Sequence, residues 1–279
     1  MVTQTLSIST PFDQIVTSHN NKLIIEISNY HIALIVKNDK NIEAFELYDV
    51  DTTKSNWQNI FAAIKNYSKI LAKQYAQSIV YLNIADALIV PASKFSKESI
   101  EPYLTTVFGN STSYKCESET IQIPENPITI YRLPLTLDTA VESNFKLTQY
   151  RHTYTKILEN LLGSSSTIIE IIKVQFYAKH MIVTVVNNST LQLIQSYAYN
   201  SAEDVIYYLL NIVQEFGLNV KSTPVEVSGL IDTQGKHFEL LENVFGRLSL
   251  ETLTVQSIFK EHLTVANAHY YTPFYNLSL

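Results

Sequence analysis

The sequence is poor in the residues from which many chemical sites are built. Of its 279 residues only 6 are glycine and 1 is cysteine, and Lys, Arg, Asp and Glu together make up 16%. The lone Cys116 excludes an internal disulfide and is typical of the reducing cytoplasm. Scarce glycine disfavours phosphate-binding loops, in which the backbone must approach the ligand closely.

Other shortages narrow the choice of partners. The net charge is −6 and no stretch is rich in Lys and Arg, so the electrostatic signature of a nucleic-acid-binding protein is missing. No apolar run is long enough to span a membrane. The N-terminal segment MVTQTLSISTPFDQ has neither a basic region nor an apolar core, so no signal peptide is predicted. We therefore expect a cytoplasmic protein with no nucleic-acid and no membrane partner.

One arrangement of hydrophobic segments occurs twice. LIIEIS at 23–28 corresponds to TIIEII at 167–172, and each is followed by two more hydrophobic segments joined by a short polar turn. This pattern predicts antiparallel hairpins. A helix and an apolar strand come next in both copies, the strands being SIVYLN at 78–83 and PVEVSG at 224–229.

The two predicted helices have matching start signals. Ser55 and Ser201 are the predicted N-caps, with Gln58 and Asp204 three residues on as capping-box partners. Apolar residues recur on one face of each helix. The predicted core residues are Trp57, Phe61, Ile64, Leu209, Val213 and Phe216. Each copy then ends in a helical stretch with Val-Phe-Gly, at 107–109 and at 244–246.

This duplication predicts an α/β protein with a duplicated ribonuclease-H-like fold, that of the actin-like ATPases, in which two lobes have mixed sheets flanked by helices. The first lobe is expected at 1–163, with a strand-rich insertion at about 116–137 and an amphipathic helix at about 143–162. The second lobe is expected at 164–279 and ends in an aromatic C-terminal tail.

The residues that give such a fold its ATPase activity are missing. In actin-like ATPases an Asp-x-Gly at the first hairpin of each lobe holds phosphate and orients a metal-bound water. Here Glu26-Ile27-Ser28 stands at the first position, and the second turn, KVQFYAKH, has neither glycine nor carboxylate. We expect no cofactor. If the cleft between the lobes binds a ligand, the candidates are Glu26, Ser28, Asn83 and Gly229, although an edge or surface glutamate on a strand explains Glu26 more simply.

Metal-dependent and nucleophilic chemistry have little support. A ribonuclease-H-type nuclease needs three or four carboxylates around two metal ions, and the first predicted helix, 55–75, contains none. None of the seven histidines forms an i, i+4 pair or lies at ligand spacing from Cys116, so no metal site is predicted. A Ser-His-Asp triad stays open, although no G-x-S-x-G motif supports it.

Two groups of aromatic residues are candidates for a surface that binds a protein partner, since tyrosine suits sites that are partly dry and partly wet. The alternative for the tail is a terminal strand that packs back on its domain. The candidate surface consists of Tyr207, Tyr208, Tyr270, Tyr271, Phe274 and Tyr275.

The segment from Gln195-Ser196-Tyr197-Ala198-Tyr199 through Glu203-Asp204 and Tyr207-Tyr208-Leu209-Leu210 to Pro224–Gly229 resembles the bacterial family named domain of unknown function 3822 (DUF3822). It departs from that family's pattern at Gln195 and Tyr197, where Asn and Phe are usual. The resemblance implies an actin-like ATPase fold with no assigned activity and supplies no catalytic residues. The leading hypothesis is a non-catalytic binding or scaffolding protein. The alternative is an atypical nucleotide- or small-ligand-binding protein that uses the interlobe cleft.

Overall fold

The computed structural model describes residues 2–9, 21–38, 41–75, 77–145, 148–163, 168–251 and 265–279, without the side chains of 148 and 265–267. These residues form two compact units. The first contains the described residues up to Gly163 together with Asn276–Leu279, and the second contains those at 168–251 and 265–275. The predicted boundary at 164 falls outside the described residues.

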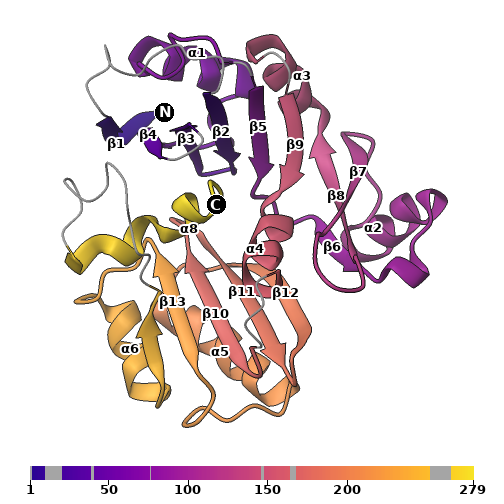
Figure 1. Ribbon diagram of the computed structural model, residues 1–279, viewed down its shortest axis with the longest axis vertical. Coiled ribbons are helices and arrows are strands. Elements are labelled where there is room, and N and C mark those ends of the chain that lie inside the picture. Colours follow the sequence, from indigo (N-terminus) through magenta and orange to yellow (C-terminus); the bar gives the residue numbers. More distant parts are fainter. Residues whose placement is uncertain are drawn as a thin grey trace. The chain divides into compact units, whose positions relative to one another are not determined.

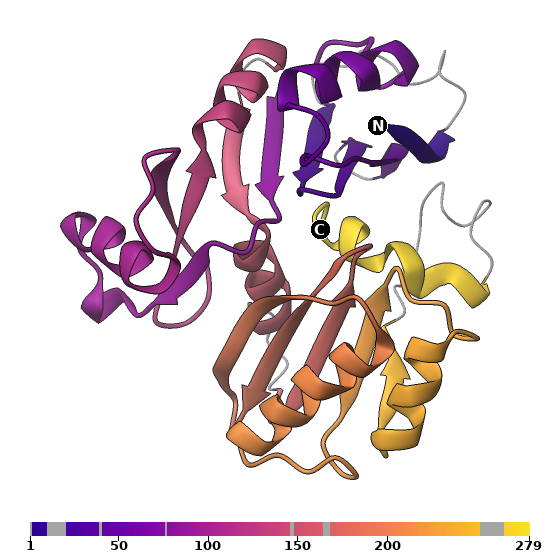
Figure 2. The same cartoon turned by 180° about the vertical axis from the view of Figure 1, so that it is seen from behind.

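The first unit is built on a six-stranded sheet in the order β1-β4-β3-β2-β5-β9. The pairs are antiparallel from β1 to β2, and β5 and β9 then add in parallel. Helices α1 and α3 lie side by side (Figures 1 and 2). The elements are β1 (Thr3–Ser9), β2 (Lys22–Ile27), β3 (His31–Lys37), β4 (Ile42–Asp49), α1 (Trp57–Tyr67), β5 (Gln77–Leu82), α3 (Leu135–Asn144), β9 (Thr148–His152) and α4 (Thr153–Leu162).

The second unit has a five-stranded sheet in the order β12-β11-β10-β13-β14. Its first three strands pair antiparallel, and β13 and β14 add in parallel. Figure 2 shows α5 and α6 on one face of this sheet, where they share a hydrophobic core with its strands. The elements are β10 (Ile171–Phe176), β11 (His180–Asn187), β12 (Thr190–Ala198), α5 (Ala202–Glu215), β13 (Val225–Gly229), α6 (Lys236–Val244), β14 (Leu248–Leu250), η3 (Val265–Tyr271) and α8 (Thr272–Asn276).

The two sheets therefore have the same connectivity. In each, a three-strand antiparallel meander leads into a helix, and a strand returns parallel to the first strand of the meander. A second helix, α3 or α6, leads to the last parallel strand, β9 or β14. This is the α/β architecture that the repeated sequence pattern predicts.

The extra segment of the first unit is longer than predicted. A three-stranded sheet in the order β6-β8-β7 lies between β5 and α3 in the chain, so the segment begins about thirty residues before the predicted 116. Ile100 and Leu104 of α2 pack on this small sheet. The Val-Phe-Gly at 107–109 therefore ends an inserted helix, and the counterpart of α6 is α3. The inserted elements are β6 (Ala87–Val90), η1 (Ala92–Lys94), η2 (Lys97–Ser99), α2 (Ile100–Phe108), β7 (Tyr114–Thr120) and β8 (Ile128–Pro134).

Local signals predict the helix starts unequally well. Ser201 caps α5 through a complete capping box with Asp204, as predicted. The cap of α1 is Asn56, one residue after the predicted Ser55, and its side chain accepts the Asn59 amide proton. The predicted helix at 143–162 is wrong at its start, because β9 occupies 148–152 and His152 caps a shorter helix, α4.

The predicted core is confirmed except at one position. Trp57, Phe61 and Ile64 on α1 and Leu209 and Val213 on α5 are buried. Phe216 is half-buried, because α5 ends at Glu215 and Phe216 is its C-cap.

The C-terminal tail is helical and not the strand that the simpler interpretation of its pattern predicts. Its last four residues also group with the first unit, whereas the sequence assigns them to the second lobe. Two hydrogen bonds explain this placement: the Lys37 ammonium donates to the carbonyl of Ser278, and Asn160 Nδ2 donates to that of Asn276 at 2.8 Å.

Candidate functional site

The β2–β3 turn of the first unit, where this fold would hold a phosphate, is closed by its own side chains. Ser28 Oγ accepts the backbone N–H groups of Tyr30 at 3.1 Å and of His31 at 2.9 Å. The Ser28 amide in turn donates to the carbonyl of His31 at 2.9 Å. Three backbone amides of this turn are therefore committed to partners within the turn.

Glu26 and His31 continue this arrangement into the core. His31 Nδ1 lies 2.7 Å from Ser28 Oγ, and His31 Nε2 lies 3.0 Å from Glu26 Oε2. Glu26 Oε1 accepts hydrogen bonds from Asn83 Nδ2 at 3.1 Å and from the Thr153 hydroxyl at 3.3 Å. All five residues are buried, so the expectation that Glu26 is an edge or surface glutamate is wrong. Because a carboxylate only accepts hydrogen bonds, we assign the proton to His31 Nε2, with Nδ1 accepting from Ser28.

The series Ser28–His31–Glu26 contains the residue types of a hydrolytic triad but not its geometry. In that triad the histidine faces the serine with Nε2 and the carboxylate with Nδ1, and here the two nitrogens are exchanged. Ser28 is only 1% exposed, and its oxygen already accepts two amide protons. A nucleophile must reach its substrate, so the arrangement stabilises the turn and gives no support to hydrolysis.

The corresponding turn of the second unit is closed by aromatic rings. Tyr177 occupies the position of Ser28, since its amide donates to the carbonyl of His180 at 2.9 Å as the Ser28 amide does to that of His31. The Tyr177 ring stacks on His180, with centroids 4.8 Å apart and planes at 7°. Phe274 packs edge-on against Tyr177 at 5.8 Å, and Tyr199 donates its hydroxyl proton to the Tyr177 carbonyl at 2.6 Å. Tyr177 is fully buried, so its ring fills the space beside the turn.

Gly229 is explained by strand packing. It has φ +89°, and a Cβ at this position would lie 2.1 Å from the carbonyl oxygen of Phe176 on the neighbouring strand β10. Only glycine allows this approach.

The four cleft candidates from the sequence fall into two separate places. Glu26, Ser28 and Asn83 belong to one buried cluster, while Gly229 lies in the other unit.

The aromatic candidates also divide. Tyr207 on α5 is 65% exposed, whereas Tyr208 is half-buried and packs on Tyr197 at 4.8 Å. Phe274 is only 1% exposed, so its assignment to an interaction surface is wrong. Tyr270, Tyr271 and Tyr275 are half-buried.

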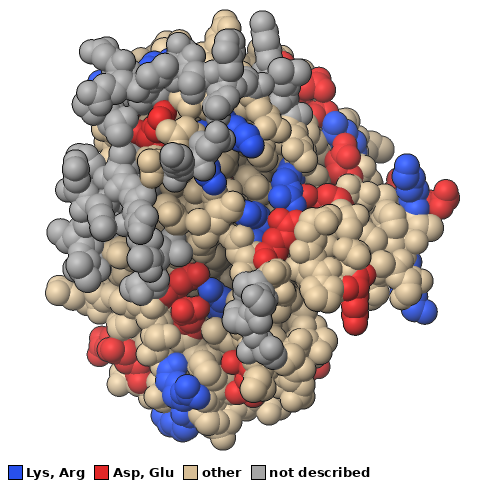
Figure 3. Space-filling view, in the orientation of Figure 1, with Lys and Arg blue, Asp and Glu red and all other residues tan. Residues whose placement is uncertain are grey.

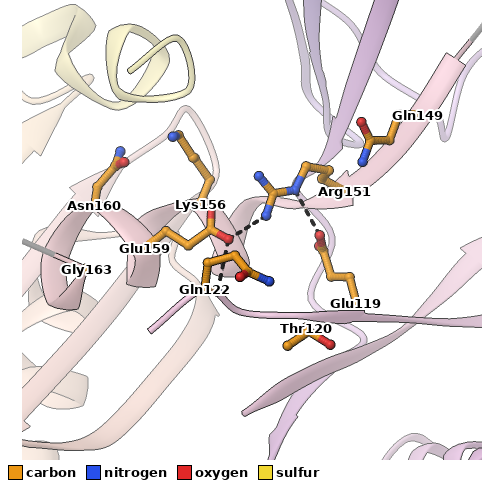
Figure 4. A pocket seen from close by; sticks show the side chains of 9 residues that line it. All are labelled: Glu119, Thr120, Gln122, Gln149, Arg151, Lys156, Glu159, Asn160 and Gly163. Atoms are coloured by element: carbon orange, nitrogen blue, oxygen red, sulfur yellow. Dashed lines mark hydrogen bonds and ion pairs between the residues drawn. The ribbon is translucent and has the colours of Figure 1, made fainter. Parts of the chain in front are cut away.

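The first unit also contains an open pocket of about 610 Å³ (Figure 4). Residues of β7, β9 and α4 line it, and Arg151 lies between two carboxylates. Its Nε is 3.0 Å from Glu119 and its Nη2 is 2.7 Å from Glu159. The lining residues are Glu119, Thr120, Gln122, Gln149, Arg151, Lys156, Glu159, Asn160 and Gly163.

Lys156 is the exception in this pocket. Its side chain points away from the Arg151–Glu159 pair (Figure 4), and within the described residues no hydrogen bond or ion pair satisfies its ammonium. Burial lowers the pKa of Lys156. The attraction of Glu159 opposes this in part, and weaker repulsion from Arg151 and Lys37 adds to the lowering of the pKa. The pocket therefore holds an ammonium group that is attracted by Glu159 but forms no ion pair or hydrogen bond with the described residues.

The described residues form neither a metal site nor a membrane-spanning helix. Neither unit brings together three His, Cys, Asp or Glu side chains that could hold a metal ion. In the same part of the chain, no helix combines the length and the hydropathy needed to cross a membrane.

Sequence reasoning missed His31 and the whole pocket. The signal for His31 was present, because Ser28 and His31 flank a short turn and Glu26 and Ser28 share one face of the strand. The pocket had no local signal. It needs the inserted sheet to place Glu119 beside β9, and the sequence assigned β9 to a helix.

Comparison with known proteins gives the fold and a family. A model of the family described as "Protein of unknown function (DUF3822)" matches residues 10–246. A Bacteroides thetaiotaomicron protein with an actin-like ATPase fold and unknown function is similar at 15% identity and a TM-score of 0.78, over 97% of this chain and 99% of that one. A chain of the PilM-PilN type IV pilus biogenesis complex is similar at 10% identity and a TM-score of 0.62, over 94% and 97%. No curated protein matches the sequence.

Proposed function

Because this chain belongs to the DUF3822 family of proteins of unknown function, we propose its role from its own residues: it is a non-catalytic binding or scaffolding protein that keeps the actin-like ATPase fold and engages a protein partner. We infer a protein partner and not nucleic acid, because the net charge of −6 disfavours binding to phosphate backbones. We place the protein in the cytoplasm, because a single cysteine, Cys116, suits a reducing compartment.

The observation that carries the proposal is the closure of both hairpin turns. A phosphate held by this fold needs free backbone amides at the turns. In the first turn the amides of Ser28, Tyr30 and His31 are bonded within the turn. In the second, the buried Tyr177 ring and its stacked partner His180 fill the equivalent place. A triphosphate would have to break both arrangements.

The similarity to a chain of the PilM-PilN complex supports a binding role. That fold neighbour is found with a partner protein, which makes partner binding compatible with this architecture. The similarity at 10% identity concerns the fold, so the partner's chemistry must come from the residues of this chain.

A thermal melt with and without millimolar Mg-ATP tests the proposal. We expect no hydrolysis and an unchanged Tm. A nucleotide present at 100 times its Kd would add about 2.7 kcal/mol of stability, which is large enough to detect. An upward shift of several degrees that excess EDTA abolishes would contradict the proposal and favour the nucleotide-binding alternative.

A further inference from the structure

We propose that the pocket lined by β7, β9 and α4 receives the carboxylate of an acidic side chain of the partner polypeptide, and that Lys156 is the cation that binds it. This inference rests on the proposed binding function and adds to it a site and a chemistry.

The charges in the pocket favour an anion. Arg151 is paired with both Glu119 and Glu159, whereas Lys156 forms no ion pair within the part of the chain that the structure describes. Lys37 adds a further positive charge near Lys156. Figure 3 shows Lys and Arg atoms next to Asp and Glu atoms over the region of β9 and α4. The charged lining side chains are two carboxylates, Glu119 and Glu159, and two cations, Arg151 and Lys156, so the pocket carries no excess of negative charge although the protein has a net charge of −6. An incoming anion would relieve the cost of burying the Lys156 cation.

The neighbouring carboxylates favour a singly charged ligand. A phosphate dianion bound at Lys156 would be repelled by Glu119 and Glu159, which line the same pocket. A carboxylate carries half that charge. Its attraction to Lys156 also acts in a partly desolvated site, where Coulomb interactions exceed their strength in water.

The other lining side chains favour a polypeptide over a cofactor. Small-molecule pockets are lined mainly by apolar and aromatic side chains. Here the lining has neither an aromatic ring nor an aliphatic side chain, so a nucleobase would find nothing to stack on. Gln122, Gln149 and Asn160 instead offer amide groups that match the N–H and C=O groups of an extended peptide.

The wall of the pocket is fixed before a ligand arrives. Glu159 Oε1 accepts the Gln122 amide at 3.2 Å as well as Arg151, and Glu119 Oε1 accepts the Thr155 hydroxyl at 2.8 Å. Groups that are already ordered lose little entropy on binding. Lys156 is the flexible element that would adjust to the carboxylate.

The test is an NMR titration of the full-length ¹⁵N-labelled protein with two capped peptides, acetyl-Gly-Glu-Gly-amide and acetyl-Gly-Gln-Gly-amide, and separately with inorganic phosphate. We expect the Glu peptide to shift the amide signals of pocket residues, with Gln122 and Gly163 as reporters. The Gln peptide should bind at least about tenfold more weakly, a difference of about 1.4 kcal/mol.

Three variants sharpen the result. Lys156→Gln should weaken binding of the Glu peptide at least about tenfold. Lys156→Arg keeps the positive charge and should retain most of that binding. Lys65→Gln removes an exposed lysine of α1 that does not line the pocket, and it should bind as the wild type does. An unchanged Tm of Lys156→Gln would show that the variant is folded, so that its loss of binding can be attributed to the missing ammonium group.

Each of four outcomes would overturn the inference: no shift with the Glu peptide, equal binding of both peptides, wild-type binding by Lys156→Gln, or binding of phosphate in place of the peptide. None of these outcomes touches the Mg-ATP melt, which tests the closed hairpin turns of the proposed function. The two proposals can therefore fail separately.

Discussion

The two hairpin turns have the same backbone arrangement and opposite chemistry. Each turn is closed by a hydrogen bond from the amide of Ser28 or Tyr177 to the carbonyl of a histidine three residues later. In the first turn that histidine, His31, belongs to a hydrogen-bonded cluster with Ser28 and Glu26. In the second turn His180 stacks on the Tyr177 ring.

The difference shows that the same turn conformation can be made unavailable to a phosphate in two ways, by a polar cluster or by stacked aromatic rings. A polar cluster is sensitive to the loss of any member, because each removal leaves a buried group without a partner. An aromatic stack depends on burial and shape. The residues two positions earlier repeat the contrast, since Glu26 accepts three hydrogen bonds from other side chains while Gln175 Oε1 is buried with no partner among the described residues.

The largest expected effect comes from changing these two equivalent positions in the same way. Glu26→Leu removes the acceptor of His31, Asn83 and Thr153, and should lower the free energy of unfolding by about 3–5 kcal/mol. Gln175→Leu removes an unsatisfied oxygen and should leave stability unchanged or raise it by up to about 1 kcal/mol.

The sole tryptophan, Trp57, is buried on α1, so its fluorescence during urea unfolding reports on the first unit. Hydrogen exchange of the β10 and β11 amides reports on the second. Equal losses at Glu26 and Gln175 would show that the polar cluster has no special role.

A second prediction concerns pH and the buried His152, which caps α4. Its Nδ1 accepts the Tyr154 amide at 3.1 Å, and its Nε2 donates to the carbonyl of Ile84 at 3.1 Å. Burial lowers the pKa of His152 to about 3, and the hydrogen bond to Ile84 opposes this in part. The unfolded chain binds the proton more readily. The stability conferred by neutral His152 is therefore complete above about pH 6.5 and is lost as the pH falls toward 3.

His152→Asn is the matched control, because asparagine can still accept at the N-cap but does not titrate. Between pH 6.5 and 5 the wild type should lose about 2 kcal/mol more than this variant, measured by urea unfolding followed at Trp57. Parallel pH profiles for the two proteins would mean that His152 is already protonated in the folded state or that it never charges in the unfolded one.

These contrasts also show how far the sequence predicts the molecule. The connectivity of both sheets follows from alternating apolar segments and turn residues, whose signals lie within a few residues of each other. The inserted sheet could not be predicted from such local signals, because α2 has the same amphipathic pattern and the same Val-Phe-Gly ending as α6. Only its packing on Val90, Ile128 and Ile130 distinguishes it.

The candidate site was less predictable than the fold. The absence of the phosphate-binding residues could be seen in the sequence, because the site needs Asp and Gly at fixed positions of each hairpin turn and other residues stand there. The way in which the turns are closed could not be predicted, since the ring that packs against Tyr177 belongs to Phe274, almost a hundred residues later in the chain. The pocket around Lys156 was hidden for the same reason, since Gln149 and Arg151 come from β9 while Glu119 comes from β7, about thirty residues earlier in the chain.

The smallest expected effects compare the helices that follow the two meanders. Ser201→Ala removes the acceptor of the Asp204 amide and half of a capping box, and Asn56→Ala removes the acceptor of the Asn59 amide. Each should cost about 1 kcal/mol, the usual value for an N-cap. Ser55→Ala should cost no more than about 0.5 kcal/mol, because Ser55 precedes the cap of α1. Urea unfolding followed at Trp57 measures the two α1 variants, and circular dichroism measures Ser201→Ala. A Ser55→Ala loss as large as that of Asn56→Ala would move the start of α1 back by one residue and make the two helix starts equivalent.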